Sequence, residues 1–333
     1  MNMLHSPKLL PATDYARDAA KKIAKARYRV AMIATTFRGD DELSSAIMDE
    51  LVRAAERGVE VSIYADVFTY LEPKEFIIRS PKRQPARAIQ AMKLERRIKK
   101  AGGNFHWLGR KANALFAGRT HSKWTVVDDI AYVGGGINID SESFSNTDYM
   151  FRFYNQALAD TLVQEQQHIY RADRGGGAMR NHSAPVSENT TILFDNGLPA
   201  NSYIYKRAHL LAQAAQHITL VSQYCPTGAL NRLLKRKDAV LYFNHWSKAS
   251  SLNKLLIRIG MLTAQQQTRY CRDQYLHAKF IIATMPDGSK TAIAGSHNFM
   301  YGSGLVGTRE VALETSDPHL IRQLEDFRHR YVE

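Results

Sequence analysis

Apolar residues recur at helical spacing near the start of the chain, over residues 14–28, with lysines on the other faces. A short apolar run over residues 30–37 then predicts a buried strand. A second helix is expected over about 43–57, and a second buried strand over 59–65. The order strand, helix, strand predicts two parallel strands joined by a right-handed crossover.

The same order of elements returns in the second part of the chain. Helical patterns over 208–216 and 230–235 alternate with apolar runs over 218–224 and 239–243. We therefore predict an α/β fold in which one α/β unit, with a mixed sheet, is duplicated within the chain.

A connection rich in glycine, serine and proline separates the two copies. The expected boundaries are residues 1–172 for the first half, 173–191 for the connection and 192–333 for the second half. The length of 333 residues is ample for two such halves.

The first half carries an insertion over about 67–100 that the second half lacks. Between Lys74 and Lys100 it has ten Lys or Arg residues, with a short apolar stretch ahead of most of them. Such a segment is typical of a surface that lies on anionic lipid, or of a solvated helix. The second half has its own apolar stripe at helical spacing, for which core packing is favoured over membrane contact: Leu252, Leu255, Leu256 and Ile259.

The composition gives the chain a strong positive charge. The formal net charge of +13 favours an anionic partner, either nucleic acid or an acidic membrane surface. Two cysteines do not make a disulfide framework, and no Cys/His group has zinc-ligand spacing. With no signal peptide and no run of about 18 apolar residues, we expect a cytoplasmic protein with peripheral membrane contact.

The segment from residue 119 to residue 138 carries the first candidate site. It predicts two strands on a tight glycine turn, which bear His121, Lys123, Asp128 and Asn138. Because side chains alternate along a strand, His121 and Lys123 are expected to point the same way. An imidazole beside a fixed cation and an amide suits an anionic substrate, most simply a phosphate.

A second copy of this pattern lies near the end of the chain. His277 and Lys279 are followed by Gly295, Ser296 and Asn298, in the same order as in the first copy. Two such patterns in one chain make a chance occurrence improbable.

Together these residues resemble the signature of the phospholipase D superfamily, H-x-K-x4-D followed by a G-G-x-N or G-S-x-N turn. The first copy fits in full, with Gly135 and Gly136 in the turn. In the second copy, Thr284 stands where the family has Asp. The resemblance extends from about residue 19 to about residue 324. Within the superfamily, the two-motif form and the motif sequences are most similar to those of bacterial cardiolipin synthases and related phosphatidyltransferases.

The resemblance implies a duplicated phospholipase D-like fold whose two halves pack around one shared active site, in a monomeric active unit. It also implies that His121 is the nucleophile and that His277 is the general acid and later the base, although the reverse order stays open. A phosphohistidine would divide the reaction into two easier steps. Lys123, Lys279, Asn138 and Asn298 would bind the phosphate oxygens, so no metal and no other cofactor is expected.

Acidic residues at matching places in the two copies are candidates to orient the imidazoles. Asp148 lies ten residues after Asn138, and Glu310 lies twelve after Asn298. Asp128 is expected to be structural, because the second copy has Thr284 in its place. The role of His297 stays open between substrate contact and capping of its loop.

The expected function is cleavage of a phospholipid phosphodiester by a phosphatidyltransferase or phospholipase D, with an alcohol or water as acceptor. The alternative is a nuclease of the same superfamily, which the positive charge suits equally. A third interpretation, a basic binding module with a decayed site, is disfavoured because both His–Lys pairs and both Asn residues are present.

Overall fold

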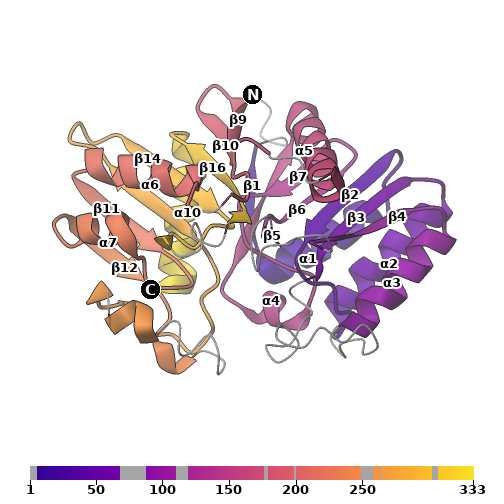
Figure 1. Cartoon of the computed structure of the whole chain (residues 1–333), viewed down its shortest axis with the longest axis horizontal. Helices are drawn as coiled ribbons and strands as arrows, with labels where there is room; N and C mark the ends of the chain where they lie inside the picture. Colours follow the sequence, from indigo (N-terminus) through magenta and orange to yellow (C-terminus); the bar gives the residue numbers. More distant parts are fainter. Residues whose placement is uncertain are drawn as a thin grey trace.

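Two mixed seven-stranded sheets form the framework of the molecule. Figure 1 shows the first half in indigo to magenta and the second half in orange to yellow. The computed structural model describes residues 6–67, 88–109, 119–175, 179–198, 200–248, 258–262, 264–301 and 307–333.

The first sheet has the strand order β1-β8-β7-β6-β2-β3-β4. Strands β2 and β3 are parallel and α2 connects them, which confirms the predicted parallel pair. The elements of this half are β1 (Lys8–Pro11), α1 (Ala12–Ile23), β2 (Arg29–Ala34), α2 (Glu42–Glu56), β3 (Glu60–Asp66), α3 (Ile89–Lys100), β4 (Asn104–Leu108), β5 (Arg119–Thr120), β6 (Trp124–Val127), β7 (Ile130–Val133), α4 (Ser141–Ser145), β8 (Tyr149–Tyr154) and α5 (Gln156–Gly175).

The second sheet has the order β12-β11-β13-β14-β16-β10-β9, and β11 and β12 are its parallel pair. Six strands therefore repeat the arrangement of the first sheet, while β4 and β9 are edge strands of one sheet each. The elements are β9 (His182–Ser187), β10 (Thr190–Phe194), α6 (Tyr203–Ala214), β11 (His217–Val221), α7 (Gly228–Leu234), β12 (Asp238–Tyr242), η5 (Trp246–Lys248), β13 (Phe280–Thr284), β14 (Lys290–Gly295), β15 (Thr308–Arg309), β16 (Val311–Thr315), α10 (Pro318–Phe327) and η6 (Arg328–Val332).

Two local features depart from the expected element boundaries. Helix α1 ends at Ile23 and not near residue 28, where the backbone N–H groups of Arg27 and Tyr28 bind the Asp128 carboxylate instead of helix carbonyls. Strand β9 lies within the expected connection and pairs with β10, so part of that segment belongs to the second sheet.

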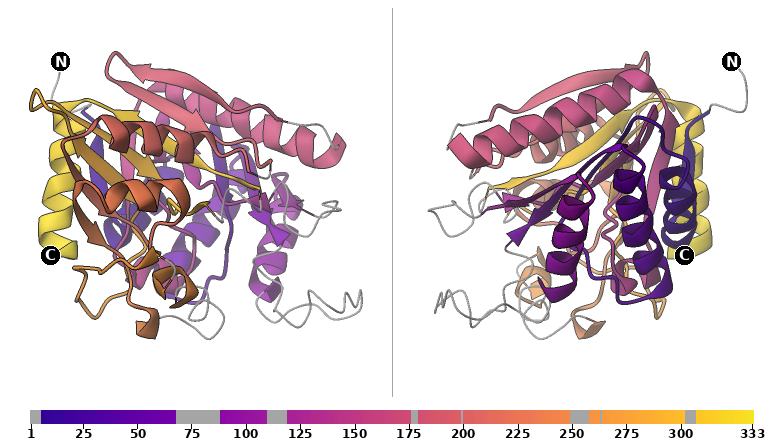
Figure 2. Two further views of the ribbon diagram at one scale, coloured as in Figure 1. Left: turned by 60° about the vertical axis from the view of Figure 1, so that its left-hand side comes forward. Right: turned by 90° about the vertical axis from the view of Figure 1, so that its right-hand side faces the viewer.

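Three clusters of buried side chains hold the layers together. One lies between the first sheet and helices α1, α2 and α3, which run side by side in Figure 2. Another lies between the second sheet and helices α6 and α7. The third lies between the two sheets, where Trp124 meets Phe194 at 6.4 Å and Tyr149 meets Phe280 at 6.0 Å between ring centroids. Aromatic packing therefore joins the two halves directly.

Several sequence expectations fall outside the described residues. They are most of the basic insertion, at 68–87, and the apolar stripe at Leu252, Leu255 and Leu256. Helix α3, at the end of the insertion, is described and exposes Lys93, Arg96 and Lys100 to solvent. Across the described ranges, no helix is both long enough and apolar enough to span a bilayer.

Candidate active site

Short strand pairings bring the two His–Lys motifs together between the halves. Strand β5, just before His121, pairs in parallel with β15 of the second half. The His121 backbone N–H donates to the carbonyl of Arg309 at 2.9 Å. The second motif repeats this arrangement, because Leu276 forms a parallel bridge with Thr147 and the His277 N–H donates to the Thr147 carbonyl at 3.0 Å. Each histidine is thus anchored on the other half.

The glycines lie at the end of the second strand of each hairpin, and not in the turn between its strands as expected for the first motif. The tight turn between β6 and β7 is Asp128–Asp129, with Asp128 at φ 54°. A side chain at Gly135 would place its Cβ 1.6 Å from the Tyr149 carbonyl oxygen. At Gly295, the Cβ would lie 2.2 Å from the Val311 carbonyl oxygen. Both positions therefore need glycine because a neighbouring backbone passes directly against them.

The two imidazoles are paired with carboxylates of the opposite half. His121 Nδ1 lies 2.9 Å from Glu310 Oε2, and His277 Nδ1 lies 2.6 Å from Asp148 Oδ2. Sequence spacing placed Asp148 and Glu310 at matching positions in the two copies. It did not indicate that each carboxylate pairs with the histidine of the opposite half. Both carboxylates are almost fully buried.

The charge states of these pairs determine which nitrogen of each imidazole carries the proton. Burial raises the pKa of both carboxyls, but the facing histidine and the neighbouring lysine together outweigh it, so each pKa lies below its usual range. Burial lowers the pKa of His121 and His277, and at His277 the Lys279 charge lowers it further. At neutral pH each ionised carboxylate therefore accepts the Nδ1 proton of a neutral imidazole. The Nε2 atom of each ring is left for chemistry.

Two lysines lie beside the histidines with no access to solvent. Lys123 Nζ donates to the His121 carbonyl at 2.6 Å, and Lys279 Nζ makes the same bond to the His277 carbonyl. Burial lowers the pKa of Lys123 to about 7 and that of Lys279 to about 8. An anion bound between them would favour the charged ammonium form, so the site is suited to a phosphate.

The asparagines occupy equivalent places but are held differently. Asn138 Oδ1 accepts from the backbone N–H of Thr35 at 3.1 Å and from its hydroxyl at 2.7 Å, which leaves Nδ2 as the donor. Asn298 is held through its backbone carbonyl by Ser222 Oγ at 2.9 Å. Its Oδ1 atom is buried without a hydrogen-bond partner among the described residues. Each asparagine can therefore offer amide atoms to a ligand.

The two glycine turns make the site asymmetric. Ser296 donates its hydroxyl to Glu310 Oε2 and accepts the Val311 N–H, so it holds the carboxylate that faces His121. The equivalent Gly136 has no side chain, and a Cβ there would lie 3.0 Å from both Asp148 Oδ2 and Lys279 Nζ. Glycine thus keeps space open beside His277.

His297, whose role the sequence left open, caps its own loop. Its Nδ1 accepts the Phe299 N–H at 2.9 Å, and its Nε2 lies 3.3 Å from Ser202 Oγ. The ring is buried, and Phe299 adopts φ 52°. His297 therefore fixes a strained turn that also carries Asn298.

Asp128 lies at the hairpin turn, where its carboxylate accepts the backbone N–H groups of Arg27, Tyr28 and Arg29 at 2.9–3.1 Å. The second half needs no acid there. Its hairpin turn is longer, and the Thr284 carbonyl itself accepts the Gln216 N–H at 2.8 Å. This difference explains the departure of the second motif at Thr284.

Replacing Asp128 with asparagine should lower the free energy of unfolding and leave turnover per folded molecule unchanged. We expect a loss of about 1–2 kcal/mol, because an amide oxygen is a weaker acceptor for three N–H groups. Chemical denaturation measures this loss, and Asp129→Asn is the matched control with an expected effect within about 0.5 kcal/mol. A fall in turnover equal to that of the Asp148 or Glu310 variants would place Asp128 in the chemistry.

No cluster of three or more His, Cys, Asp or Glu side chains in the described part of the chain is arranged to hold a metal ion. The basic groups of the site are Lys123, Lys279, His121 and His277.

A family model described as "Cardiolipin synthase, PLD-like domain" matches residues 20–170, which include the first His–Lys motif. A search of curated proteins found no match.

Among solved structures, phosphatidylserine synthase from Haemophilus influenzae Rd KW20 is similar with a TM-score of 0.73 and 13% identity, over 98% of this chain and 86% of that chain. Polyphosphate kinase from Porphyromonas gingivalis is similar with a TM-score of 0.60 and 13% identity, over 96% of this chain and 49% of that chain. At these identities the likeness establishes the duplicated fold, and the substrate has to be argued from the site.

Proposed function

We propose that this chain is an enzyme of the phospholipase D superfamily, namely a cardiolipin synthase-like phosphatidyltransferase that acts on an anionic phospholipid. One observation carries the proposal: two imidazoles, each oriented by a carboxylate of the opposite half, face one site with two buried lysines. Displacement at phosphorus needs a nucleophile and an acid for the leaving oxygen, and this arrangement supplies one of each.

In the first step, His121 Nε2 attacks phosphorus, and the bond from phosphorus to the leaving alcohol oxygen breaks. A phosphate anion bound beside His277 favours the protonated form of its imidazole. This imidazolium donates its Nε2 proton to the leaving oxygen. The result is a phosphohistidine on His121 and a neutral His277.

In the second step, His277 Nε2 removes a proton from the acceptor, which is an alcohol or water. The acceptor oxygen attacks phosphorus, the bond to His121 breaks, and His277 is again protonated. Since His277 acts once as acid and once as base, the pKa of its imidazole governs both steps.

Lys123, Lys279, Asn138 and Asn298 are proposed to bind the non-bridging oxygens. Negative charge grows on these oxygens in the transition state, and donors already fixed in a buried site stabilise it by several kcal/mol. The lowered pKa values of the lysines support this role, because a site that disfavours charge when empty gains most from an anion.

A lipid substrate is supported by the family match and by the positive charge of the chain. The decisive experiment incubates the purified protein with phosphatidylglycerol vesicles and, separately, with single-stranded DNA, followed by product analysis. We expect released glycerol, together with phosphatidic acid or cardiolipin, and none of these with His121→Ala. Cleavage of DNA without any lipid product would reject the proposal in favour of a nuclease.

Turnover is expected to persist after exhaustive treatment with EDTA. The reason is that lysine and asparagine groups are proposed to supply the charge stabilisation that a metal gives elsewhere. Initial rates before and after chelation measure this, with a metal-dependent phosphodiesterase as the positive control. A loss that magnesium or zinc restores would contradict the metal-free mechanism.

A further inference from the structure

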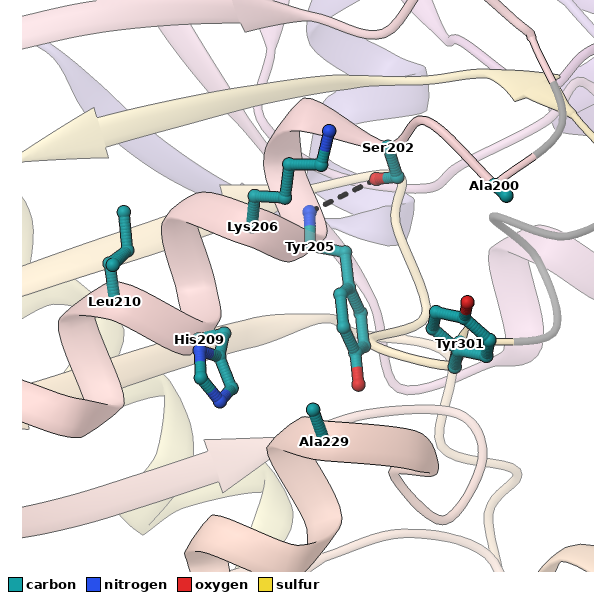
Figure 3. Close-up of a pocket in the computed structure, with 8 residues that line it drawn as sticks. All are labelled: Ala200, Ser202, Tyr205, Lys206, His209, Leu210, Ala229 and Tyr301. Carbon is teal, nitrogen blue, oxygen red and sulfur yellow. Dashed lines mark hydrogen bonds between the residues drawn. The ribbon is translucent and has the colours of Figure 1, made fainter.

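A pocket of about 370 Å³ lies on the second half, between the first turns of α6 and α7 and the chain that follows Asn298. Its walls are mostly apolar, and Figure 3 shows the rings of Tyr205 and Tyr301 beside Ala229, with His209, Lys206 and Leu210 further along α6. The volume falls within the range of small-molecule sites, about 300–1,000 Å³.

The walls of this pocket are held in place by specific contacts. The Tyr205 hydroxyl donates to the Thr227 carbonyl at 2.7 Å and accepts the Leu230 N–H at 2.9 Å. The two tyrosine rings pack edge to face, with centroids 5.8 Å apart. Gly228 has φ +70°, and a Cβ there would lie 2.6 Å from Tyr301 Cβ. The pocket is therefore a fixed feature that needs no rearrangement to accept a ligand.

The pocket opens among exposed apolar side chains. Leu210 is 54% exposed and Tyr301 is 44% exposed, although both are large and apolar. These two side chains extend the apolar wall of the pocket to the protein surface.

The charged groups at this pocket select the kind of ligand. Lys206 and His209 line it, and none of the described residues that line it is an Asp or Glu. Lys206 Nζ contacts the amide oxygen of Asn201 at 2.9 Å, so its charge is not neutralised by that partner. An apolar interior beside a cation fits an amphiphile with an anionic head group.

The pocket lies beside the turn that carries Asn298. Tyr301 follows Asn298 by three residues, so their Cα atoms are at most about 11 Å apart. Ser202, in the pocket wall, contacts His297 in the same turn. A phospholipid whose phosphodiester lies between the histidines is therefore long enough to reach the pocket.

We propose that this pocket binds an acyl chain of the phospholipid whose phosphodiester occupies the site between His121 and His277. The inference rests on the proposed function, since it names the part of that substrate which the pocket receives. It also gives the protein a way to prefer long-chain lipids over soluble phosphodiesters, because each buried methylene adds to binding.

The direct test is equilibrium binding of cis-parinaric acid, a fluorescent long-chain fatty acid. We expect the wild-type protein to bind it, and Ala229→Trp, which fills the pocket, to weaken binding about tenfold or more. Leu210→Glu, an exposed change that does not threaten folding, should weaken binding through charge repulsion. Ala157→Trp is the matched control, because Ala157 is exposed and is also the second residue of its helix.

Turnover separates this inference from the proposed function. With phosphatidylglycerol, the Ala229→Trp and Leu210→Glu variants should raise KM when the acyl chains are long, and leave cleavage of bis(p-nitrophenyl) phosphate unchanged. Equal binding of parinaric acid by wild type and both variants, or unchanged KM for long-chain lipid, would overturn the inference while the lipid activity stands. If the wild-type protein turns over no lipid, the proposed function fails, and this inference fails with it.

Discussion

Replacing His121 with alanine should abolish the covalent intermediate, whereas replacing His277 should leave its formation possible. Steady-state turnover should fall in both variants by on the order of 10⁴-fold or more, because each removes a group on which the chemistry depends. The variants should differ with a p-nitrophenyl phosphodiester, whose leaving group needs no proton. His277→Ala should then still form the phosphohistidine and fail to hydrolyse it.

The position of the phosphoryl group gives a second measurement. His121 Nδ1 is bound to Glu310, so the adduct should form at Nε2, which phosphorus NMR of the trapped protein distinguishes from Nδ1. His319→Ala, a change at an exposed histidine, serves as the control and should label as wild type does. Labelling of His121→Ala but not of His277→Ala would reverse the two roles and keep the shared site.

Each carboxylate pairs with the histidine of the opposite half, and mutation can distinguish this arrangement from one in which each carboxylate pairs with the histidine of its own half. Asp148→Asn should reproduce the defect of His277→Ala, because Asp148 faces His277 across the halves. Glu310→Gln should reproduce the defect of His121→Ala and prevent labelling. Each change should lower turnover by on the order of 10⁴-fold, since an amide no longer sets the tautomer of the imidazole. The melting temperature should change little, because the replacements have the same shape.

The pH profile tests the same contact independently. The hydrogen bond and charge of Asp148 raise the pKa of His277, against the lowering by burial and by Lys279. Removal of that carboxylate therefore lowers the pKa further, so less of the protonated acid remains at any given pH. The alkaline limb of kcat/KM should shift to lower pH in Asp148→Asn, measured with a substrate whose leaving group needs a proton.

A contrary pattern would be clear. If Asp148→Asn prevents labelling while Glu310→Gln permits it, each carboxylate serves the histidine of its own half. If both variants keep the wild-type pH profile, neither carboxylate sets the charge of an imidazole.

The sequence alone determined the duplicated α/β architecture, because the patterns that reveal each strand and helix lie within that element. Buried parallel strands read as short apolar runs, and helices show their own period, so both copies of the unit are visible without tertiary information. The same reason explains why the sequence revealed the candidate residues His121, Lys123, His277 and Lys279. Each copy of their motif spans only a few consecutive residues, so the repeat is visible without the fold. The Asp at the hairpin turn also fitted a structural role, because its counterpart is Thr284.

Only the tertiary structure decided which carboxylate faces which histidine. The paired residues His121 and Glu310 are 189 positions apart, and His277 and Asp148 are 129 positions apart. Matching spacing in two equivalent copies fits pairing within a half as well as pairing between halves. The choice comes from the parallel pairing of β5 with β15 and from the bridge between Thr147 and Leu276, which bring each histidine to the opposite half. The pocket beside Tyr301 depends on the packing of α6 against α7 in the same way, and contacts of this kind leave no periodic pattern in a sequence.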